Sequence, residues 1–383
     1  MNSKFENNEL TIFVQGTVDT SNAEQFGEEV ATIRAKHPDC PLIFDCDELT
    51  YISSAGLRQI LKVKKANKDF KIINANSQIY EIFEMTGFTE MIDIHKAYRK
   101  IDVSGCEKIG EGSNGIVYRL NADTIIKVYK NNDALEDIKR ERELARTALV
   151  MGINTAIPYD VVKVDDKYGS VFEMLDNKSI TKWIKADPDN IEKYINLFVD
   201  MLKEIHNTIV KPGVLPSEKE VVLKWVTFLK DYIDEEHYNK LRSLVEEVPE
   251  SDHMLHGDYH TGNVHWDMKE SILIDMDTIC VGNPIFEFGS IYNAFEGYGL
   301  TDEKRVSKFL HLDIDTCKHI LVRTIQLYYG VEDVTEIIYK CKVVGLTRAL
   351  RRTIKREPDN VEYINCVKPL LLEAIDHVDT LII

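Results

Sequence analysis

The first hundred residues alternate short apolar runs with amphipathic segments. Four runs have the length and the β-branched or aromatic content of strands, at about 10–14, 41–45, 70–73 and 91–94. Between them, apolar residues recur every three or four positions, a spacing typical of helices, over about 22–36, 51–68 and 77–86. Strands that alternate with helices predict an α/β domain over residues 1–98, with helical connections between the strands of one sheet.

A second pattern begins after a short connection at 99–104. Residues 105–176 are rich in strand-like runs and contain one amphipathic helix, expected over 136–150, whereas residues 177–383 are mostly helical in their periodicity. Strand runs followed by helix runs indicate an α+β fold. The chain therefore predicts a small α/β domain, a linker, and a bilobal α+β domain with a β-rich lobe ahead of a helical lobe.

Composition narrows the classes of function. The chain has 383 residues, 44% hydrophobic and 29% charged, and a formal net charge of −17, which argues against non-specific binding to nucleic acid or to an anionic membrane surface. No apolar run approaches the ~20 residues of a membrane helix, and the first residues lack the apolar region of a signal peptide. The seven cysteines are widely spaced, and we expect reduced thiols. These features predict a globular protein that stays in the cytoplasm.

The stretch with the clearest chemistry is His-Gly-Asp-Tyr-His-Thr-Gly-Asn at 256–263, which Asp275 follows within an apolar run. Phosphoryl transfer from a nucleotide needs a carboxylate that orients or deprotonates the attacking hydroxyl, and oxygen ligands that hold Mg²⁺ on the phosphates. Asp258 is the candidate catalytic carboxylate. Asn263 and Asp275 are the candidate Mg²⁺ ligands, and Asp277 is a further oxygen donor nearby. The order and spacing of these residues are those of a kinase catalytic loop and its metal loop.

Four histidines in the same region raise the alternative of a zinc site: His253, His256, His260 and His265. Their spacing fits neither the common zinc patterns with cysteine nor a His-Glu-x-x-His helix, and two glycines indicate a loop. Oxygen ligation of Mg²⁺ is therefore favoured, and His256 is expected to brace the loop by hydrogen bonds.

A glycine-rich motif precedes this region. Gly110, Gly112 and Gly115 form a Gly-x-Gly-x-x-Gly sequence, a spacing that dinucleotide-binding folds use between a strand and a helix. Here two strand-like runs follow the glycines, and the second carries Lys127 among apolar residues. A glycine loop between strands, followed by a strand lysine, is the kinase arrangement. It predicts that the loop covers the phosphates of ATP and that Lys127 reaches the α- and β-phosphates.

The expected nucleotide contacts extend from this loop to the strand that leads into the hinge between the lobes. They are Gly110, Gly112, Ser113, Asn114, Gly115, Val117, Lys127, Glu173 and Leu175. The last two would bind adenine through their backbone, and Val117 lies in the strand after the loop.

A strand lysine is more often surface-facing, so Lys127 counts as a candidate because of its position after the glycine loop. A carboxylate on the core-facing stripe of a helix needs a cation, and Lys127 is the available one. Glu141 shares the apolar stripe of the helix expected over 136–150, so its helical phase turns it towards the core and makes it the preferred partner of Lys127. Glu143 is the alternative, and both glutamates could instead belong to a solvated charged face.

The catalytic stretch resembles the aminoglycoside phosphotransferase and choline kinase family, whose loop reads His-Gly-Asp followed by four residues and Asn. Residues 281–289 resemble the family's Gly-Asp-Pro segment, with Asn283 in place of the commoner aspartate and Glu287 at its usual acidic position. No Ala-Pro-Glu motif follows, and the spacing leaves no room for a protein-kinase activation segment. The resemblance implies a protein kinase-like fold and transfer of the γ-phosphate of ATP, with Mg²⁺, to a hydroxyl of a small molecule.

Residues 1–98 resemble a STAS domain, the fold of bacterial anti-sigma factor antagonists. The resemblance rests on Gly-Thr-Val-Asp at 16–19 and, above all, on Tyr-Ile-Ser-Ser-Ala-Gly-Leu at 51–57. In that family a serine just before the Gly-Leu pair opens a helix and is phosphorylated, which makes Ser54 the candidate phosphosite and Ser53 the second choice. A phosphate there would face the free N–H groups of a helix N-terminus, although both serines are also ordinary helix caps.

Two functions follow from the combined chain. The first is an ATP-dependent phosphotransferase that acts on a small-molecule hydroxyl, while the STAS-like domain regulates it or binds a protein partner. The second is a partner-switching regulator of the anti-sigma factor antagonist type. Its kinase-like half would sense nucleotide or phosphorylate a protein serine, with Ser54 as the candidate. Neither hypothesis predicts a nucleic-acid or membrane partner.

Overall fold

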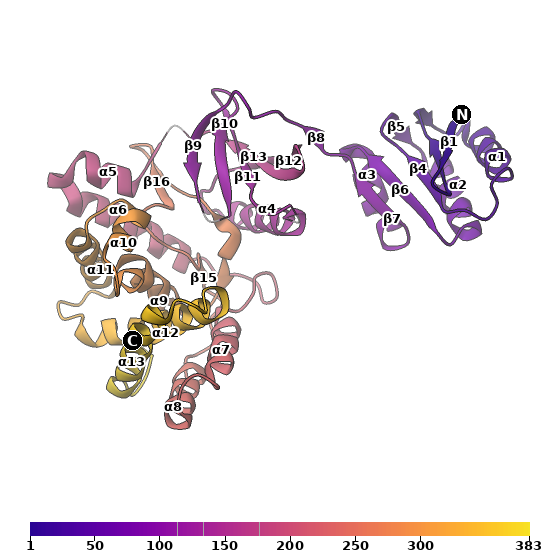
Figure 1. The fold of residues 1–383 in the computed structure, drawn as a ribbon. Coiled ribbons are helices and arrows are strands. Elements are labelled where there is room, and N and C mark those ends of the chain that lie inside the picture. Colours follow the sequence, from indigo (N-terminus) through magenta and orange to yellow (C-terminus); the bar gives the residue numbers. More distant parts are fainter. Residues whose placement is uncertain (113, 133, 176) are drawn as a thin grey trace. The chain divides into compact units, whose positions relative to one another are not determined.

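The computed structural model describes residues 1–112, 114–132, 134–175 and 177–383. The chain forms two compact units, one of residues 1–105 with 161–169 and one of residues 106–160 with 170–383. Figure 1 labels the helices and strands of each unit. In the part of the chain that the structure describes, no helix is both long and apolar enough to cross a membrane.

The first unit is built on a five-stranded sheet with the order β1-β2-β4-β6-β7. β1 and β2 pair antiparallel, whereas the remaining pairs are parallel. The strands are β1 (Asn2–Glu6), β2 (Glu9–Phe13), β4 (Leu42–Asp45), β6 (Phe70–Ala75) and β7 (Asp93–Lys96). The helices are α1 (Ala23–Arg34), α2 (Ser54–Ala66) and α3 (Ser77–Met85). This is the α/β arrangement that the alternating pattern predicts.

Alternating residues of the parallel strands fill the core of this unit. Leu10, Leu42 and Phe70 occupy partner positions on three neighbouring strands and are at most 2% exposed. Two residues further along each strand, the next buried row is Ile12, Phe44 and Ile72. These rows fix the register, because a slip of one residue would turn the apolar side chains of a strand to the opposite face.

One helix boundary differs from the sequence expectation. Residues Leu49–Ile52 form strand β5, which pairs in parallel with β3 (Gly16–Val18). The helix expected from residue 51 therefore begins at Ser54, and the earlier start is wrong. Pairing with a strand distant in the sequence outweighs the local helical spacing here, because it buries Leu49 and Ile52.

The expected linker begins in a strand. β8 (Arg99–Lys100) pairs in parallel with β12 (Pro158–Val164). Tyr98 packs edge to face against Tyr168, with the ring centres 5.3 Å apart. Residues 161–169 therefore group with the first unit.

The β-rich lobe of the second unit contains the neighbouring strands β9, β10, β11 and β13. β10 pairs antiparallel with both β9 and β11. The bounds are β9 (Glu107–Glu111), β10 (Gly115–Arg119), β11 (Thr124–Tyr129), β13 (Lys167–Glu173) and the following helix α4 (Leu135–Val150). The glycine motif thus joins two strands, as in the kinase arrangement, and a helix does not follow it directly.

The helical lobe contains long helices and short two-residue or three-residue strands. The helices are α5 (Ile180–Ala186), α6 (Ile191–His206), α7 (Glu218–Leu229), α8 (Glu235–Glu246), α9 (Pro284–Phe295), α10 (Lys304–Leu310), α11 (Ile314–Tyr329), α12 (Thr335–Arg356) and α13 (Val361–His377). The strands are β14 (Lys178–Ser179), β15 (Met254–Leu255), β16 (Val264–Trp266), β17 (Ser271–Leu273) and β18 (Cys280–Val281).

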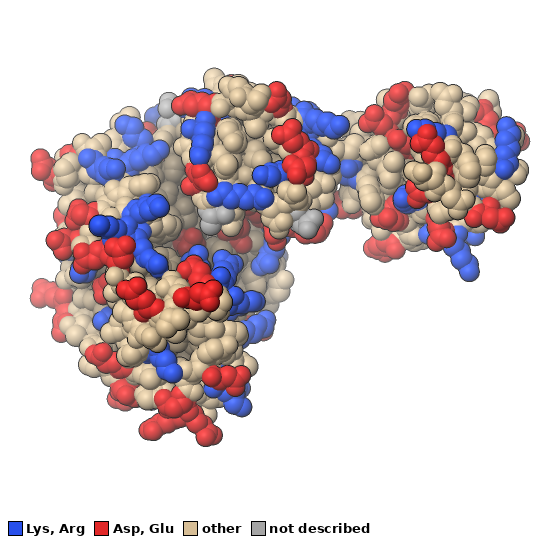
Figure 2. Space-filling view, viewed as in Figure 1, with Lys and Arg blue, Asp and Glu red and all other residues tan. Residues whose placement is uncertain are grey.

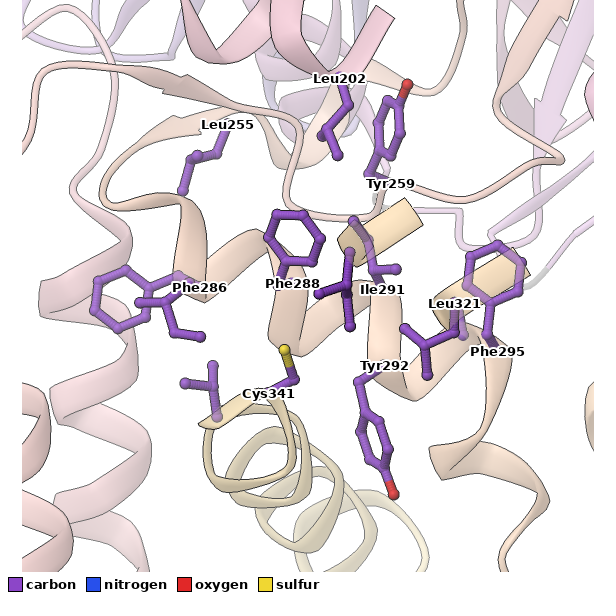
Figure 3. Packing of buried hydrophobic residues seen from close by; sticks show 14 of the residues in the cluster. Leu202, Leu255, Tyr259, Phe286, Phe288, Ile291, Tyr292, Phe295, Leu321 and Cys341 are labelled. Atoms are coloured by element: carbon purple, nitrogen blue, oxygen red, sulfur yellow. The ribbon is translucent and has the colours of Figure 1, made fainter. Parts of the chain in front are cut away.

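Helix α9 lies at the centre of the helical lobe, and every residue after its first proline is buried. Figure 3 shows Phe288 and Ile291 of α9 packed among Leu202 of α6, Leu321 of α11 and Cys341 of α12. Because neighbouring helices cover α9 on all sides, its residues cannot move without disturbing the rest of the lobe.

Helices α9 and α12 approach closely at a pair of glycines. A Cβ on Gly345 would lie 2.6 Å from the carbonyl oxygen of Gly289. Asn293 donates from Nδ2 to the carbonyl oxygen of Gly345 at 2.7 Å. A side chain at Gly345 would therefore push the two backbones apart.

We expect Gly345→Ala to lower the free energy of unfolding of the second unit by about 1–3 kcal/mol, the usual cost of overpacking a core. The added methyl group meets backbone, and this clash outweighs the roughly 1 kcal/mol by which alanine favours a helix over glycine. Chemical denaturation followed by circular dichroism measures the change. Gly105→Ala is the control, because a Cβ there meets nothing within 4 Å, and equal stability of the two variants would contradict the prediction.

Candidate active site

Two short antiparallel ladders bring the two predicted loops together. Leu255 of β15 pairs with Cys280 of β18, and Val264 of β16 pairs with Leu273 of β17. The first loop, 256–263, joins β15 to β16, and the second joins β17 to β18. Each ladder therefore fixes one end of both loops, so that the candidate catalytic and metal-binding side chains face one another.

A buried carboxylate on α9 anchors the first loop. Glu287, which is 1% exposed, accepts hydrogen bonds from the backbone N–H groups of His256 and Gly257, the latter at 3.0 Å to Oε1. Its Oε2 lies 3.8 Å from Nε2 of His206. Burial would raise the pKa of Glu287, but the nearby His206 imidazole and the hydrogen bond from Gly257 N lower it overall. Glu287 thus stays ionised and holds the first residues of the loop through their backbone N–H groups.

Gly257 is required for the path of this loop. Its φ is +81°, and a Cβ there would lie 2.4 Å from the carbonyl oxygen of Thr278. Thr278 in turn donates from Oγ1 to the carbonyl oxygen of His256 at 2.8 Å. The two loops therefore contact each other backbone to backbone at a position that only glycine can occupy without displacing its neighbour.

Two side chains from α9 and α12 complete the support of the loop. Ser290 donates from Oγ to the carbonyl oxygen of Gly257 at 3.0 Å. Arg348 donates from Nη1 to the same oxygen at 2.7 Å and to Ser290 Oγ at 2.8 Å. Sequence reasoning missed both roles, because Arg348 appears in the sequence only as part of a basic run and Ser290 lacks any motif.

The structure places the predicted Asp258 and Asn263 in direct contact. Asn263 donates from Nδ2 to the carbonyl oxygen of Asp258 at 3.0 Å, and its own carbonyl oxygen accepts from Ile274 N at 3.0 Å. The carboxylate of Asp258 is 37% exposed, and its Oδ2 lies 4.0 Å from Nε2 of His260. A partly exposed carboxylate on a braced loop can receive a proton from a substrate hydroxyl.

Lys127 lies between two carboxylates that come from different elements. Its Nζ is 2.9 Å from Glu141 Oε1 on α4 and 2.9 Å from Asp275 Oδ1 after β17. Tyr129 donates to the other oxygen of Glu141, whereas the alternative Glu143 is exposed. Burial would lower the pKa of Lys127, but Asp275 and Glu141 raise it above its ordinary value, so the ammonium group stays charged.

Carboxylates are concentrated where the second loop begins. Asp275 has a left-handed backbone, with φ 64° and ψ 59°, which is uncommon outside glycine. Burial, together with the charges of Asp275 and Glu141, raises the pKa of Asp277 to about 7. Such crowding of acidic oxygens favours a bound cation.

The donor set fits Mg²⁺ better than zinc. Oxygen atoms of Asn263, Asp275 and Asp277 are the hard ligands that Mg²⁺ prefers, and Mg²⁺ is commonly held by one or two carboxylates together with substrate phosphates. Across the described residues, no three His, Cys, Asp or Glu side chains lie close enough to hold a metal by themselves. An Mg²⁺ ion would therefore depend on the amide of Asn263 and on nucleotide phosphates.

The four histidines of this region are engaged in separate hydrogen bonds. His253 contacts the carbonyl oxygen of His206, His256 contacts that of Ile274, His260 accepts from Gly262 N, and His265 contacts Asn177 Oδ1. Their ring nitrogens point to different partners, which argues against a shared imidazole site.

The glycine loop turns tightly between β9 and β10. Gly112 N donates to the carbonyl oxygen of Gly115 at 2.9 Å, and Asn114 donates from Nδ2 to Asp277 Oδ2 at 3.4 Å. Ser113, also predicted to contact the phosphates, lies outside the described residues. The loop is thereby linked to the metal-loop carboxylates.

Strand pairing aligns the other predicted nucleotide contacts. Val117 pairs with Gly110 on one side and with Lys127 on the other, so the three residues lie side by side across the sheet. At the hinge, Met174 N donates to the carbonyl oxygen of Asp123 at 2.7 Å. Glu173 N donates to the carbonyl oxygen of Ile157 at 3.3 Å. The carbonyl oxygen of Glu173 and the backbone of Leu175 therefore stay the hinge candidates for adenine. The Glu173 side chain accepts from Ile157 N at 2.9 Å and so does not itself face a ligand.

In the first unit, the two candidate phosphosites have different environments. Ser53 is the N-cap of α2, and its Oγ accepts from Gly56 N at 3.3 Å. Ser54 is the first helical residue and is exposed. Ser54 is therefore the hydroxyl that a modifying enzyme can reach without removing the cap.

Comparisons with known proteins assign both units. The family model of the STAS domain matches residues 1–102, and that of the phosphotransferase enzyme family matches residues 105–305. The first unit is similar to a putative anti-sigma factor antagonist, BtrV, of Bordetella bronchiseptica. The two are 32% identical over 89 residues, which cover 22% of this chain and 76% of the relative.

Solved structures of aminoglycoside phosphotransferases share the fold of the second unit. A thermostable mutant of APH(4)-Ia in a ternary complex with ADP and hygromycin B covers 78% of this chain and 98% of its own, with 11% identity and a TM-score of 0.51. APH(4)-Ia itself covers 72% of this chain and 94% of its own, with 10% identity and a TM-score of 0.51. At this identity the likeness concerns the fold alone.

Glu218, the first residue of α7, is an acidic group of the site that sequence reasoning missed. It lies beside Cys280 and Arg348, and burial raises its pKa from 4.5 to about 7 against the opposing charge of Arg348. The unfolded chain ionises this carboxyl near pH 4.5, whereas the folded chain keeps it protonated to about pH 7. The contribution of Glu218 to the free energy of unfolding is therefore fully present below pH 4.5. It is lost as the pH rises towards and through 7, because the ionised carboxyl is disfavoured in the folded chain.

We expect Glu218→Gln to match the wild type in stability near pH 4.5 and to exceed it by up to about 3 kcal/mol at pH 8, since each pH unit of such a difference is worth about 1.4 kcal/mol. Urea unfolding at both pH values measures the change. Glu220→Gln, an exposed position on the same helix, is the control and should show no pH-dependent gain. A gain of equal size at both pH values would show that titration of Glu218 is not the cause.

Proposed function

Because the chain belongs to the phosphotransferase enzyme family and carries a STAS domain at residues 1–102, we propose that it transfers the γ-phosphate of ATP, with Mg²⁺, to a hydroxyl group of a small molecule. The observation that carries the proposal is the position of Lys127, 2.9 Å from both Glu141 and Asp275. This contact joins the nucleotide-facing sheet to the loop pair that holds Asp258.

Each part of the site has a role in this proposal. Asp258 accepts the proton of the acceptor hydroxyl as its oxygen attacks the γ-phosphorus, and the bond to the β–γ bridging oxygen breaks to release ADP. Lys127 binds the α- and β-phosphates, and Glu141 fixes its direction. Asn263 and Asp275 hold Mg²⁺, which when bound offsets charge on the phosphate oxygens.

The nucleotide is held from the opposite lobe. The loop from Gly110 to Gly115 covers the phosphates with backbone N–H groups, as the Gly-x-Gly-x-x-Gly motif does in kinases. The backbone of Glu173 and Leu175 binds adenine at the hinge. The hydrogen bond between Asn114 and Asp277 supports a loop position close to the metal ligands.

A small-molecule acceptor is supported by the short path after the metal loop. Only a 3-10 turn (Met276–Thr278) and the two-residue strand β18 separate Asp275 from α9. An activation segment that could position a peptide substrate is thus absent from this described stretch of chain. The helical lobe instead places α7, α10 and α12 around the loop.

A second function is favoured by the environment of Ser54. Its exposed hydroxyl at the start of α2, next to a serine that already caps the helix, supports reversible phosphorylation that regulates binding of a protein partner. The similarity to a putative anti-sigma factor antagonist supports the same role for the first unit. In this second proposal the kinase-like unit senses nucleotide or phosphorylates serine.

We expect Asp258→Asn to lower kcat by about 10²- to 10⁴-fold, the usual contribution of a general base, while nucleotide affinity is retained. ADP release with a panel of aminoglycosides, choline and sugars gives the rate, and calorimetry gives the affinity. Asp252→Asn is the control, since it removes an exposed carboxylate from the same stretch. Unchanged turnover in Asp258→Asn would exclude it as the base, and absence of nucleotide binding in the wild type would end the proposal.

Intact-mass measurement after incubation with Mg-ATP separates the two functions. A phosphorylated small molecule with an unmodified chain is the expected result for the first. Phosphate on the chain that disappears in both Ser54→Ala and Asp258→Asn would favour the second. Ser53→Ala is the matched control, because it weakens the α2 cap by about 1 kcal/mol and should leave the phosphorylation of Ser54 in place.

A further inference from the structure

A cluster of arginines on α12 lies beside the proposed catalytic loop. Arg348, Arg351 and Arg352 are spaced three and four residues apart, so they share one side of the helix. We call these three residues the arginine face. Each guanidinium lies over an aromatic ring, that of Trp225 at 5.7 Å, Phe228 at 5.9 Å and Tyr298 at 5.6 Å, respectively.

The arginine face makes no direct ion pair with the described carboxylates, although the charges of Asp258, Glu218 and Glu287 act on Arg348 from a longer distance. Among the described residues, no carboxylate oxygen lies within 4.0 Å of any of its three guanidinium groups, although many other basic groups of the chain are in ion pairs. The polar partners of Arg348 and Arg352 are the neutral Gly257 carbonyl, Ser290 hydroxyl and Tyr298 hydroxyl. In a chain of net charge −17, unpaired arginines gathered at one place are unusual.

Contacts place this cluster next to Asp258. Arg348 binds the carbonyl oxygen of Gly257, the residue before Asp258. On the other side, His260 lies 4.0 Å from Asp258, and its ring packs against Phe309 at 4.9 Å. Phe309 packs against Tyr298 at 6.0 Å, whose hydroxyl accepts from Arg352. Through His260, Phe309 and Tyr298, this series of contacts leads from Asp258 to Arg352.

This side of the site is open to a ligand. Phe309 is 44% exposed, and Tyr298 and Arg352 are only half-buried. On the visible face of the second unit, acidic and basic side chains are interspersed (Figure 2). The arginine face therefore differs from its surroundings in charge, in aromatic neighbours and in its position beside the proposed base.

We propose that the acceptor is an anionic hydroxyl compound. Its carboxylate or phosphate group binds the arginine face, chiefly through Arg352, while its hydroxyl group reaches Asp258. This inference deepens the proposed phosphotransferase function and rests on it. Guanidinium groups bind carboxylate and phosphate through paired N–H donors, and a partly buried setting strengthens that attraction. The same positive charge repels polyamines, so an amino-sugar acceptor is disfavoured.

The test compares anionic, neutral and cationic ligands with related carbon skeletons. The full chain is saturated with Mg²⁺ and AMP-PNP, so that anions cannot enter the proposed nucleotide site, and is titrated with gluconate, glucose 6-phosphate, glucose and glucosamine. Glycerate, glycerol 3-phosphate, glycerol and 3-amino-1,2-propanediol form a second set. We expect at least one anionic member to bind about tenfold or more tightly than the neutral and cationic members of its set. Comparing the two carboxylates, gluconate and glycerate, with the two phosphate esters shows which anionic group is preferred.

Substitutions then locate the binding. Arg352→Gln should remove most of the preference for the anion. Tyr298→Phe, which removes the hydroxyl group that holds Arg352 in position, should reduce the preference. Lys342→Gln is the control, because it removes one positive charge from another part of α12 and should leave the preference unchanged. Circular dichroism verifies that each variant is folded.

The contrary outcomes are distinct. Tighter binding of the amines, no binding of any anion, or an anion preference that Arg352→Gln leaves intact would each overturn the inference. If AMP-PNP does not bind, the proposed function fails, but the comparison of anions and amines on the nucleotide-free chain still tests the arginine face.

Discussion

The contact on which the second unit depends is the ammonium group of Lys127 between two carboxylates. Lys127 is in β11, Glu141 is in α4, and Asp275 follows β17 of the helical lobe. A single buried cation thus joins the sheet, its helix and the metal loop. Removing it would leave the buried Glu141 and the partly exposed Asp275 without their shared counter-charge, which destabilises the buried Glu141 more. Under the proposed function, the same ammonium group binds the nucleotide phosphates, and one of the carboxylates that hold it, Asp275, is also a proposed Mg²⁺ ligand.

The loop that carries Asp258 is held from two sides by different chemistry. Glu287 accepts its backbone N–H groups, while Arg348 donates to the carbonyl oxygen of Gly257. The N–H groups of His256 and Gly257 and the carbonyl oxygen of Gly257 are thus bonded to charged side chains. Hydrogen bonds to charged groups are stronger than those between neutral groups. Rigid support of this kind leaves the Asp258 carboxylate free for chemistry and positions it without using its own oxygens.

Much of this arrangement could be predicted from the sequence. The strand lysine, the choice of Glu141 over Glu143 as its neighbour, and the adjacency of Asp258 and Asn263 all follow from local spacing, and the structure has these contacts. The start of α2 could not be predicted, since pairing of β5 with β3 decides it. Nor could Arg348, Ser290 and Glu218 be recognised, because they reach the loop from helices distant in the sequence.

The sequence by itself determined the order of the parts: an α/β domain, a glycine loop, a strand lysine, a catalytic loop and a metal loop. Such features are encoded in runs of a few residues, where periodicity and turn chemistry act locally. Only the tertiary structure decided which charges are paired. It paired Lys127 with two carboxylates and, among the described residues, left the arginine face without a direct ion pair. Ion pairing depends on distances of a few ångströms between segments that are far apart in the chain.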